Sequence, residues 1–499
     1  MENCFRYNNK NELLDVLLMR EINKAELNYL QVRSQMELGY YVYDGWTGGP
    51  NFPLEETMKN ERTSFLKNGV PTELKKLNEF VHRMTQVDAL KNKTLWTIAD
   101  GYLSYMCEDY TSARKSFEQA ATSSFLREAD KNQLLILNLL VDLREKKIAL
   151  PNFENELANK LTQLETLVQS SKEGELYQQV FRNVLKSELP AYFMRKQDSL
   201  REMLSYQRFE NSYESYKEPS SEKRLKHFSD CYFSHSGSLL DRYFSQQQLT
   251  GLIDFQRSAT SPLDRWLLQG NRYDERIVRE LQGVKYFRNF EYEKALDILK
   301  NQDNLPVVPD IFYMTVNDYQ DLGENNMEQT YTTKEVLEQL IDLKKKAPSD
   351  PFMAYRYASV LYSLSYHGRC HEAWNFYRDA TETAPYYFNS TAGHYTPFEL
   401  QYYYADEAYT WFRKAYDKST DPITKQNALW MMAKCEQKRC PSDGEKQPYW
   451  NIDDAHDYVN WCVNQNAWLA RFHNQYKGTA FYQKVYEECA YLQLFAAKH

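Results

Sequence analysis

Glycine and proline are scarce in this chain of 499 residues, which holds 16 copies of each. This share (16/499, about 3%) lies below the typical values of about 7% for glycine and about 5% for proline. Because both residues interrupt helices, their scarcity favours helix along most of the chain. Clusters of β-branched residues bounded by turns are nearly absent, so we expect no sheet. The composition therefore predicts an all-α protein.

Long apolar runs and a secretion signal are also missing. No stretch of 18 apolar residues is present, so we expect no membrane-spanning helix. The start of the chain has no basic segment followed by a clean apolar one, because the apolar run from Leu13 to Met19 is short and is followed by Arg20 and Glu21. We expect a cytoplasmic location by default, with the periplasm or cell surface as the alternative if the chain is a processed form.

A surplus of basic residues is absent as well. The chain has 61 basic and 69 acidic residues, and its net charge is −8. A general nucleic-acid binder needs basic surface to displace counterions, so we expect no nucleic-acid partner. The eight cysteines are scattered without a CxxC pair, and we expect free thiols rather than a disulfide framework.

Motifs for catalysis and cofactor binding are not found. The chain lacks GxGxxG after a strand, GxxxxGK[ST], HExxH and GxSxG. His367 and His371 are four residues apart with Cys370 between them, but Gly368 and Arg369 predict a turn that would separate them. We expect no catalytic residue, no cofactor and no metal.

The acidic segment around Gly323 does not match a calcium-binding loop. If Gly323 is the sixth residue of such a loop, Asp318 is the first, Leu322 the fifth and Gln329 the twelfth. The fifth and twelfth positions then lack the carboxylates that calcium requires. We interpret residues 301–331 as an inserted loop.

Aromatic residues are abundant, with 40 tyrosines, 25 phenylalanines and 9 tryptophans. Tyrosine commonly packs between helices with its hydroxyl group at the surface. The same residues are favoured at binding interfaces, so an aromatic surface built for contacts is the alternative.

Two short helices with a recurrent pattern are predicted between Pro351 and Pro385. The first would run from about residue 353 to 366 and the second from about 371 to 383, joined by a turn at 367–369. In the second helix, small and large residues recur every three or four positions and share one face; they are Ala373, Tyr377, Ala380 and Ala384. Pro385 would end this helix.

The same pattern of small and large residues recurs elsewhere in the chain. Residues 95–122 carry Gly101, Ala113, Phe117 and Ala120, and residues 277–299 carry Gly283, Tyr286, Tyr292 and Ala295. A further copy has Ala408, Phe412 and Ala415, and Ala408 follows Ala373 by 408 − 373 = 35 residues. The glycines are expected to face the second helix of each pair.

These copies resemble tetratricopeptide repeats, whose period is 34 residues. The tyrosine-rich and glycine-poor style is similar to divergent repeat proteins of Bacteroidota-type bacteria. The resemblance implies a TPR-like α-solenoid of antiparallel helix pairs, here with irregular repeats, whose concave face binds peptides or partner proteins. We expect an N-terminal helical region, 1–215, with one clear repeat at 95–122, and a C-terminal array, 226–499, that contains the loop 301–331.

The function expected from this resemblance is a non-enzymatic scaffold that binds a peptide or protein partner. The candidate binding residues are aromatic: Tyr386, Tyr387, Phe388, Tyr402, Tyr403, Tyr404, and Trp46 in the glycine-rich segment 39–57. Three consecutive tyrosines on a helix point about 100° apart, so at least one must face solvent or a partner. An enzyme or glycan-binding protein with an aromatic-lined groove, and a structural subunit of a larger assembly, are the alternatives. The oligomeric state stays open.

Overall fold

The computed structural model describes residues 11, 13–30, 32–33, 67–87, 90–145, 152–214, 227–231, 237, 240–241, 244–303, 305–313, 316, 318, 329–376, 396–438 and 463–499. Several residues named above lie outside these ranges: Trp46, Tyr377, Ala380, Ala384, Pro385, Tyr386, Tyr387 and Phe388. The chain divides into two compact units. The first comprises residues 1–223, 233–243 and 250–272, and the second comprises 224–232, 244–249 and 273–499.

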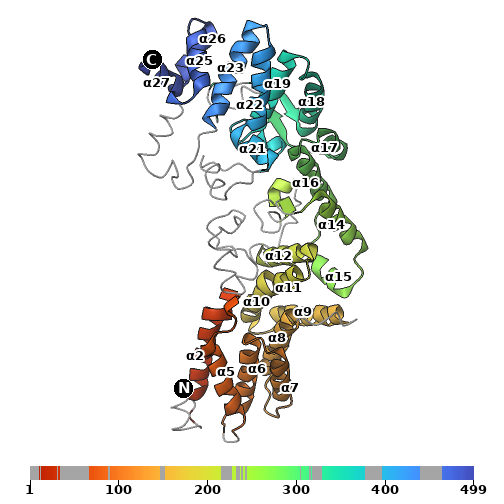
Figure 1. Cartoon of the computed structure of the whole chain (residues 1–499). Coiled ribbons are helices and arrows are strands. Elements are labelled where there is room, and N and C mark those ends of the chain that lie inside the picture. Colours follow the sequence, from red (N-terminus) through yellow and green to blue (C-terminus); the bar gives the residue numbers. More distant parts are fainter. Residues whose placement is uncertain are drawn as a thin grey trace. The chain divides into compact units, whose positions relative to one another are not determined.

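The first unit is helical in its described residues (Figure 1). Its α-helices are α2 (Leu13–Ala25), α5 (Thr72–Thr85), α6 (Lys93–Met106), α7 (Tyr110–Ala121), α8 (Glu128–Arg144), α9 (Phe153–Ser170), α10 (Gly174–Asn183), α11 (Leu189–Arg195), α12 (Ser199–Glu214) and α15 (Pro262–Leu268). Two π-helical turns, Glu26–Leu30 and Val184–Glu188, continue α2 and α10. Helix α14 (Gln246–Ser258) begins in the second unit and ends in the first.

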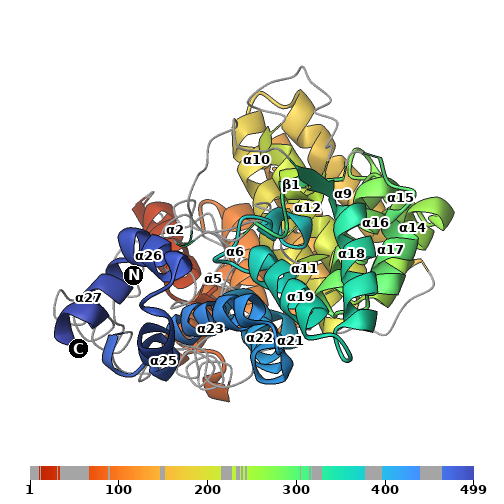
Figure 2. The same ribbon diagram turned by 90° about the horizontal axis from the view of Figure 1, so that it is seen from above.

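The second unit is also mainly helical (Figure 2). It contains the 3₁₀ turns Phe228–Cys231 and His371–Ala373 and the helices α16 (Glu275–Arg288), α17 (Tyr292–Leu299), α18 (Thr333–Lys346), α19 (Pro351–Leu364), α21 (Pro397–Tyr404), α22 (Asp406–Lys418), α23 (Pro422–Gln437), α25 (Ala467–Tyr476), α26 (Ala480–Glu488) and α27 (Ala490–Lys498). The all-α class is confirmed.

A short β-ribbon corrects the expectation that no sheet is present. Strand β1 (Val307–Pro309) pairs antiparallel with β2 (Thr330–Thr332), and Val308 lies opposite Tyr331. Each strand has three residues, which is too short to produce a recognisable alternation of polar and apolar residues. The ribbon joins the two ends of the segment that the sequence predicts to be an inserted loop.

Two glycines, Gly101 and Gly283, lie in close contacts between neighbouring helices. A Cβ atom on Gly101 of α6 would lie 2.4 Å from the ring of Phe117 on α7. A Cβ atom on Gly283 of α16 would lie 2.5 Å from Leu299 on α17. Both distances are far below van der Waals contact, so a larger residue at either position would force the facing side chain or helix to shift. The small residues Ala113, Ala120 and Ala295 are buried in the same two contacts.

Three helix pairs share one turn, and the third pair was not predicted. The turns after α6, α11 and α16 place Glu108, Gln197 and Phe290 in the left-handed region, with φ values of 65°, 59° and 60°. In each turn the next residue donates its N–H to a carbonyl oxygen five positions earlier, at 2.9, 3.0 and 3.0 Å. This hydrogen bond closes the Schellman motif, which usually has glycine at the left-handed position.

Gln197→Gly is expected to stabilise the first unit by about 0.5–1 kcal/mol. The left-handed conformation costs an L-residue roughly 1–2 kcal/mol, and glycine avoids this cost at a smaller loss of backbone entropy. Gln197 is exposed, so little packing is lost. Urea unfolding of the wild type, Gln197→Gly and Gln197→Ala tests this. The alanine variant retains the strain and should show no gain; equal gains from both variants would contradict the explanation.

The second helix predicted at residues 371–383 is wrong over its described part. Residues 371–373 form a 3₁₀ turn, and residues 374–376 are not helical. The Cys370 N–H donates to the carbonyl oxygen of Ser363 at 2.8 Å, and the Trp374 indole N–H donates to that of Leu364 at 2.6 Å. These bonds fold the chain back onto the end of α19, so a helix does not begin at His371.

Helix α19 packs instead against α22, which comes later in the sequence. Ala408, Phe412 and Ala415 are fully buried. The Phe412 ring lies 5.7 Å from that of Tyr355 on α19. Figure 2 shows α22 beside α23, and α19 adjoins both helices. The 35-residue spacing between Ala373 and Ala408 therefore does not join two equivalent helices.

Candidate functional site

The described part of the predicted tyrosine patch lies at the end of α21. Tyr402 is 1% exposed, and its ring lies 4.9 Å from Tyr403 and 5.4 Å from Phe398. Tyr403 and Tyr404 are half-buried. The Tyr366 N–H donates to the carbonyl oxygen of Tyr402 at 2.8 Å. Tyr402 is therefore a core residue, and the exposed tyrosine surface of α21 is limited to parts of its two neighbours.

We expect Tyr402→Ala to destabilise the second unit by about 3–5 kcal/mol, as is usual for a buried aromatic residue. Tyr404→Ala should cost about 1 kcal/mol or less, because its side chain is half-exposed. Thermal unfolding of Tyr402→Ala, Tyr403→Ala and Tyr404→Ala provides the comparison. If Tyr402, Tyr403 and Tyr404 all cause large and equal losses, none of them belongs to a binding surface.

Asp318 is buried among cationic and hydroxyl groups of α19, α23 and the residue that follows α23. Its carboxylate oxygens lie 2.8 Å from the Lys434 Nζ atom and 2.6 Å from the Lys438 Nζ atom. The Tyr362 hydroxyl donates to Oδ1 at 2.8 Å. Burial opposes ionisation, but the two lysines outweigh it and hold the pKa of Asp318 well below its usual range. This carboxylate would be the first ligand of a calcium loop around Gly323, but in the structure it forms ion pairs with two lysines of the protein.

His367, Cys370 and His371 occupy a bent segment, as predicted. The His367 ring contacts the carbonyl oxygen of Tyr403 through Nε2 at 2.9 Å, and the Cys370 Sγ atom lies 3.5 Å from the carbonyl oxygen of Pro309. Burial, together with Lys438, lowers the pKa of His367 to about 3. The imidazole is therefore neutral at pH 7 and donates its Nε2–H to the carbonyl group.

The stability of the second unit is expected to fall as the pH decreases below about 6.5. The pKa of His367 is about 3 in the folded state and about 6.5 in an unfolded chain, so the unfolded chain binds the proton first. The contribution is complete above pH 6.5 and declines by up to about 1.4 kcal/mol per pH unit towards pH 3. His367→Gln keeps an N–H donor without this titration. Urea unfolding between pH 7 and 4.5 should show a shallower decline for the variant; equal slopes would contradict this assignment.

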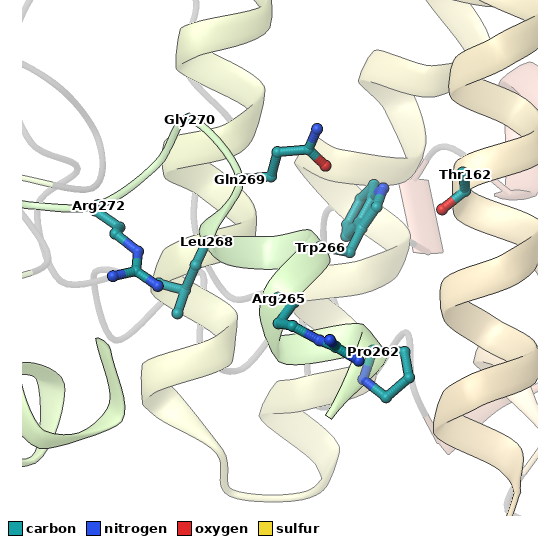
Figure 3. Close-up of a pocket in the computed structure, with 8 residues that line it drawn as sticks. All are labelled: Thr162, Pro262, Arg265, Trp266, Leu268, Gln269, Gly270 and Arg272. Carbon is teal, nitrogen blue, oxygen red and sulfur yellow. The ribbon is translucent and has the colours of Figure 1, made fainter. Parts of the chain in front are cut away.

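An open pocket of about 820 Å³ lies in the first unit (Figure 3). We call it the arginine pocket. Helix α15 and the turn after it supply most of its lining, and α9 supplies one residue. The lining residues are Thr162, Pro262, Arg265, Trp266, Leu268, Gln269, Gly270 and Arg272.

Buried polar groups hold this lining in place. Arg208 of α12 donates to the carbonyl oxygens of Trp266 at 2.6 Å and Gln269 at 2.9 Å, which satisfies the end of α15. Its guanidinium group lies 4.0 Å above the Trp266 ring. Glu165 of α9 accepts from Arg208 at 2.9 Å and from the Trp266 indole N–H at 3.1 Å. Burial lowers the pKa of Arg208, and the Glu165 carboxylate opposes that shift.

Two arginines give the pocket a positive charge. Arg265 and Arg272 are exposed, and neither has a hydrogen bond or an ion pair with any residue that the structure describes. The nearby carboxylates are already engaged: Asp264 accepts from Arg201 at 2.8 Å, and Glu165 accepts from Arg208. The pocket therefore has the opposite sign to the net charge of the chain, which is −8.

The arginine pocket has no recognisable signature in the sequence. Arg265 and Arg272 are seven residues apart in a segment without a known motif, and nothing in their spacing separates them from other surface arginines. The available signal was local: Ser261 and Pro262 predict a helix start, Gly270 predicts its end, and Trp266 lies in a helix only seven residues long. The partners Glu165 and Arg208 are too distant in sequence to be paired with them.

Comparisons of the sequence with protein-family models, with curated proteins and with solved structures find no match. Within the described ranges, no helix has both the length and the apolar character needed to cross a bilayer. The tetratricopeptide-like assignment therefore stays a prediction that depends on the helix pairs themselves.

Proposed function

We propose that the chain is a TPR-like helical array that acts as a non-enzymatic scaffold and binds a peptide or protein partner in the arginine pocket. The three helix pairs with the same turn support the repeat architecture. Two of them also have a glycine twelve residues before a buried alanine, Gly101 before Ala113 and Gly283 before Ala295. Stacked pairs of this kind bury a continuous core and leave a surface for partners.

The observation that carries the proposal is the composition of the arginine pocket. Its volume, about 820 Å³, falls within the range of about 300–1,000 Å³ for ligand pockets. Half-buried Pro262 and the narrow exposed edges of Trp266 and Leu268 provide apolar contact, while Gln269 and the arginines provide hydrogen-bond donors. Its described lining has no carboxylate, imidazole or thiol, and arginine stays protonated at neutral pH. These groups hold and orient a ligand, as a binding site requires.

A displayed library of random twelve-residue peptides tests the proposal. We expect the intact chain to enrich a set of related peptides. Binding of these peptides should fall at least about tenfold in Gln269→Trp, which fills the pocket, because the loss of a few contacts costs more than 1.4 kcal/mol. Lys115→Trp on α7, an exposed position outside the pocket, is the control and should bind normally. No enrichment, or enriched peptides that both variants bind equally, would contradict the proposal.

A further inference from the structure

We infer that the arginine pocket selects an acidic peptide segment, with one carboxylate on Arg265 and another on Arg272. The inference depends on the proposed function and specifies the chemistry of the ligand. Three features of the first unit support it: two arginines without partners among the described residues, the separation of these arginines along the pocket, and a fixed apolar part of the lining.

The first feature is the charge that the fold leaves available. Arg201 binds Asp264 at 2.8 Å, and Arg208 binds both oxygens of Glu165 at 2.9 Å. These two acids are thus each matched by an arginine of α12. Arg265 and Arg272 have no such match among the described residues, so their charges act on a ligand.

The second feature is the geometry of the two arginines. Figure 3 shows Arg265 extending towards Pro262, whereas Arg272 extends beside Leu268. The two guanidinium groups are therefore separated along the pocket. A ligand that carries two anionic groups suits this separation better than a single small ion. Each planar guanidinium group can bind a carboxylate through two parallel hydrogen bonds.

The third feature is the fixed apolar part of the lining. In Figure 3 Leu268 lies beside Arg272, whereas Trp266 lies on the side of Arg265 and Pro262. Both side chains are almost fully buried, at 3% and 5% exposed, so they offer a ligand only their edges, and Arg208 and Glu165 fix the indole. An apolar side chain between two acidic ones could contact these edges while the carboxylates bind the two arginines. The ligand class is thus a peptide with acidic residues on either side of an apolar residue.

Fluorescence anisotropy with two labelled heptapeptides tests the inference on the intact chain. The acidic peptide GEELEEG and its uncharged counterpart GQQLQQG have the same size and the same central leucine. We expect GEELEEG to bind at least about tenfold more tightly, because a hydrogen bond to a charged group contributes about 1.5–3 kcal/mol. Arg265→Gln and Arg272→Gln should each weaken GEELEEG binding about tenfold. Added salt should weaken the binding of GEELEEG to the wild type, because it screens the attraction between the carboxylates and the arginines.

Lys115→Gln, which makes the same change in net charge on α7, should bind GEELEEG as the wild type does. Equal affinity for the two peptides, no binding of GEELEEG, or arginine variants that bind normally would overturn the inference. Inorganic phosphate that binds as tightly as GEELEEG would show a single-anion site and would overturn it as well. The library distinguishes the two failures: neutral peptides that bind in the pocket overturn only the inference, whereas no peptide binding contradicts the proposed function itself.

Discussion

Asp318→Asn is expected to destabilise the second unit by about 3–5 kcal/mol, the usual cost of removing one partner from a buried ion pair. The change leaves Lys434, which is 3% exposed, and Lys438, which is 11% exposed, without their carboxylate. The asparagine side chain keeps the shape but cannot compensate two buried positive charges. Urea unfolding at pH 7 measures the loss.

The matched control for this variant is Asp342→Asn on α18. Asp342 also pairs with a lysine, at 2.6 Å, but both side chains are about half-exposed. Exposed pairs contribute about 0–1 kcal/mol, so the control should be nearly neutral. Similar losses for Asp318→Asn and Asp342→Asn would show that the buried charges are not coupled as described.

Since the pKa of Asp318 is lowered, the contribution of its carboxylate to the stability is complete above about pH 4 and declines below that value.

Gly101→Ala is expected to destabilise the first unit by about 1–3 kcal/mol, although alanine is the better helix former by about 1 kcal/mol. The added methyl group would lie 2.4 Å from the Phe117 ring, so α6 and α7 must separate. Differential scanning calorimetry should show the loss. Gly251→Ala on α14 is the control, since no described atom outside the neighbouring part of its own helix lies within 4 Å of its Cβ position, and it should stabilise by about 0.5–1 kcal/mol.

The pair Gly101→Ala and Phe117→Leu then isolates the contact between the two residues. Phe117→Leu alone creates a gap, but it also makes room for the methyl group at position 101. The double variant should therefore lose less stability than the two single losses added together, because residues in direct contact are coupled. If the stability losses of the two single variants simply add up in the double variant, the effect of Gly101→Ala does not arise from its contact with Phe117.

Local packing could be predicted from the sequence, because its determinants lie close together along the chain. Gly101 and Phe117 belong to adjacent helices joined by a three-residue turn, and so do Gly283 and Leu299. The pair α11–α12 has the same turn but was missed. It has Pro190 where the other two pairs have glycine, seven residues before the left-handed position, so the small-residue signal is absent.

The parts that could not be predicted depend on residues far apart in sequence. Ala373 has the spacing of a helical face, but the hydrogen bond of Trp374 to the end of α19 decides the local conformation. The two lysines that pair with Asp318 are more than a hundred positions away, so residue spacing alone suggests a metal ligand at Asp318. The arginine pocket depends on Arg208 and Glu165 holding α15, which no local pattern reveals.

The shared Schellman turn allows two kinds of contact to be set by different residues. One kind holds the two helices of a pair together, and the other connects the pair to the rest of its unit. The left-handed residue lies in the turn between the two helices, and in two of the three turns its side chain contacts a residue outside the pair. Glu108 contacts Arg33 from its turn, whereas the Phe290 ring lies 6.0 Å from Trp374. Glycine would relieve the backbone but would remove these connections. The residue at the left-handed position can therefore differ from one helix pair to the next. Its side chain determines which other part of the unit the pair contacts, while the hydrogen bond of the turn stays the same.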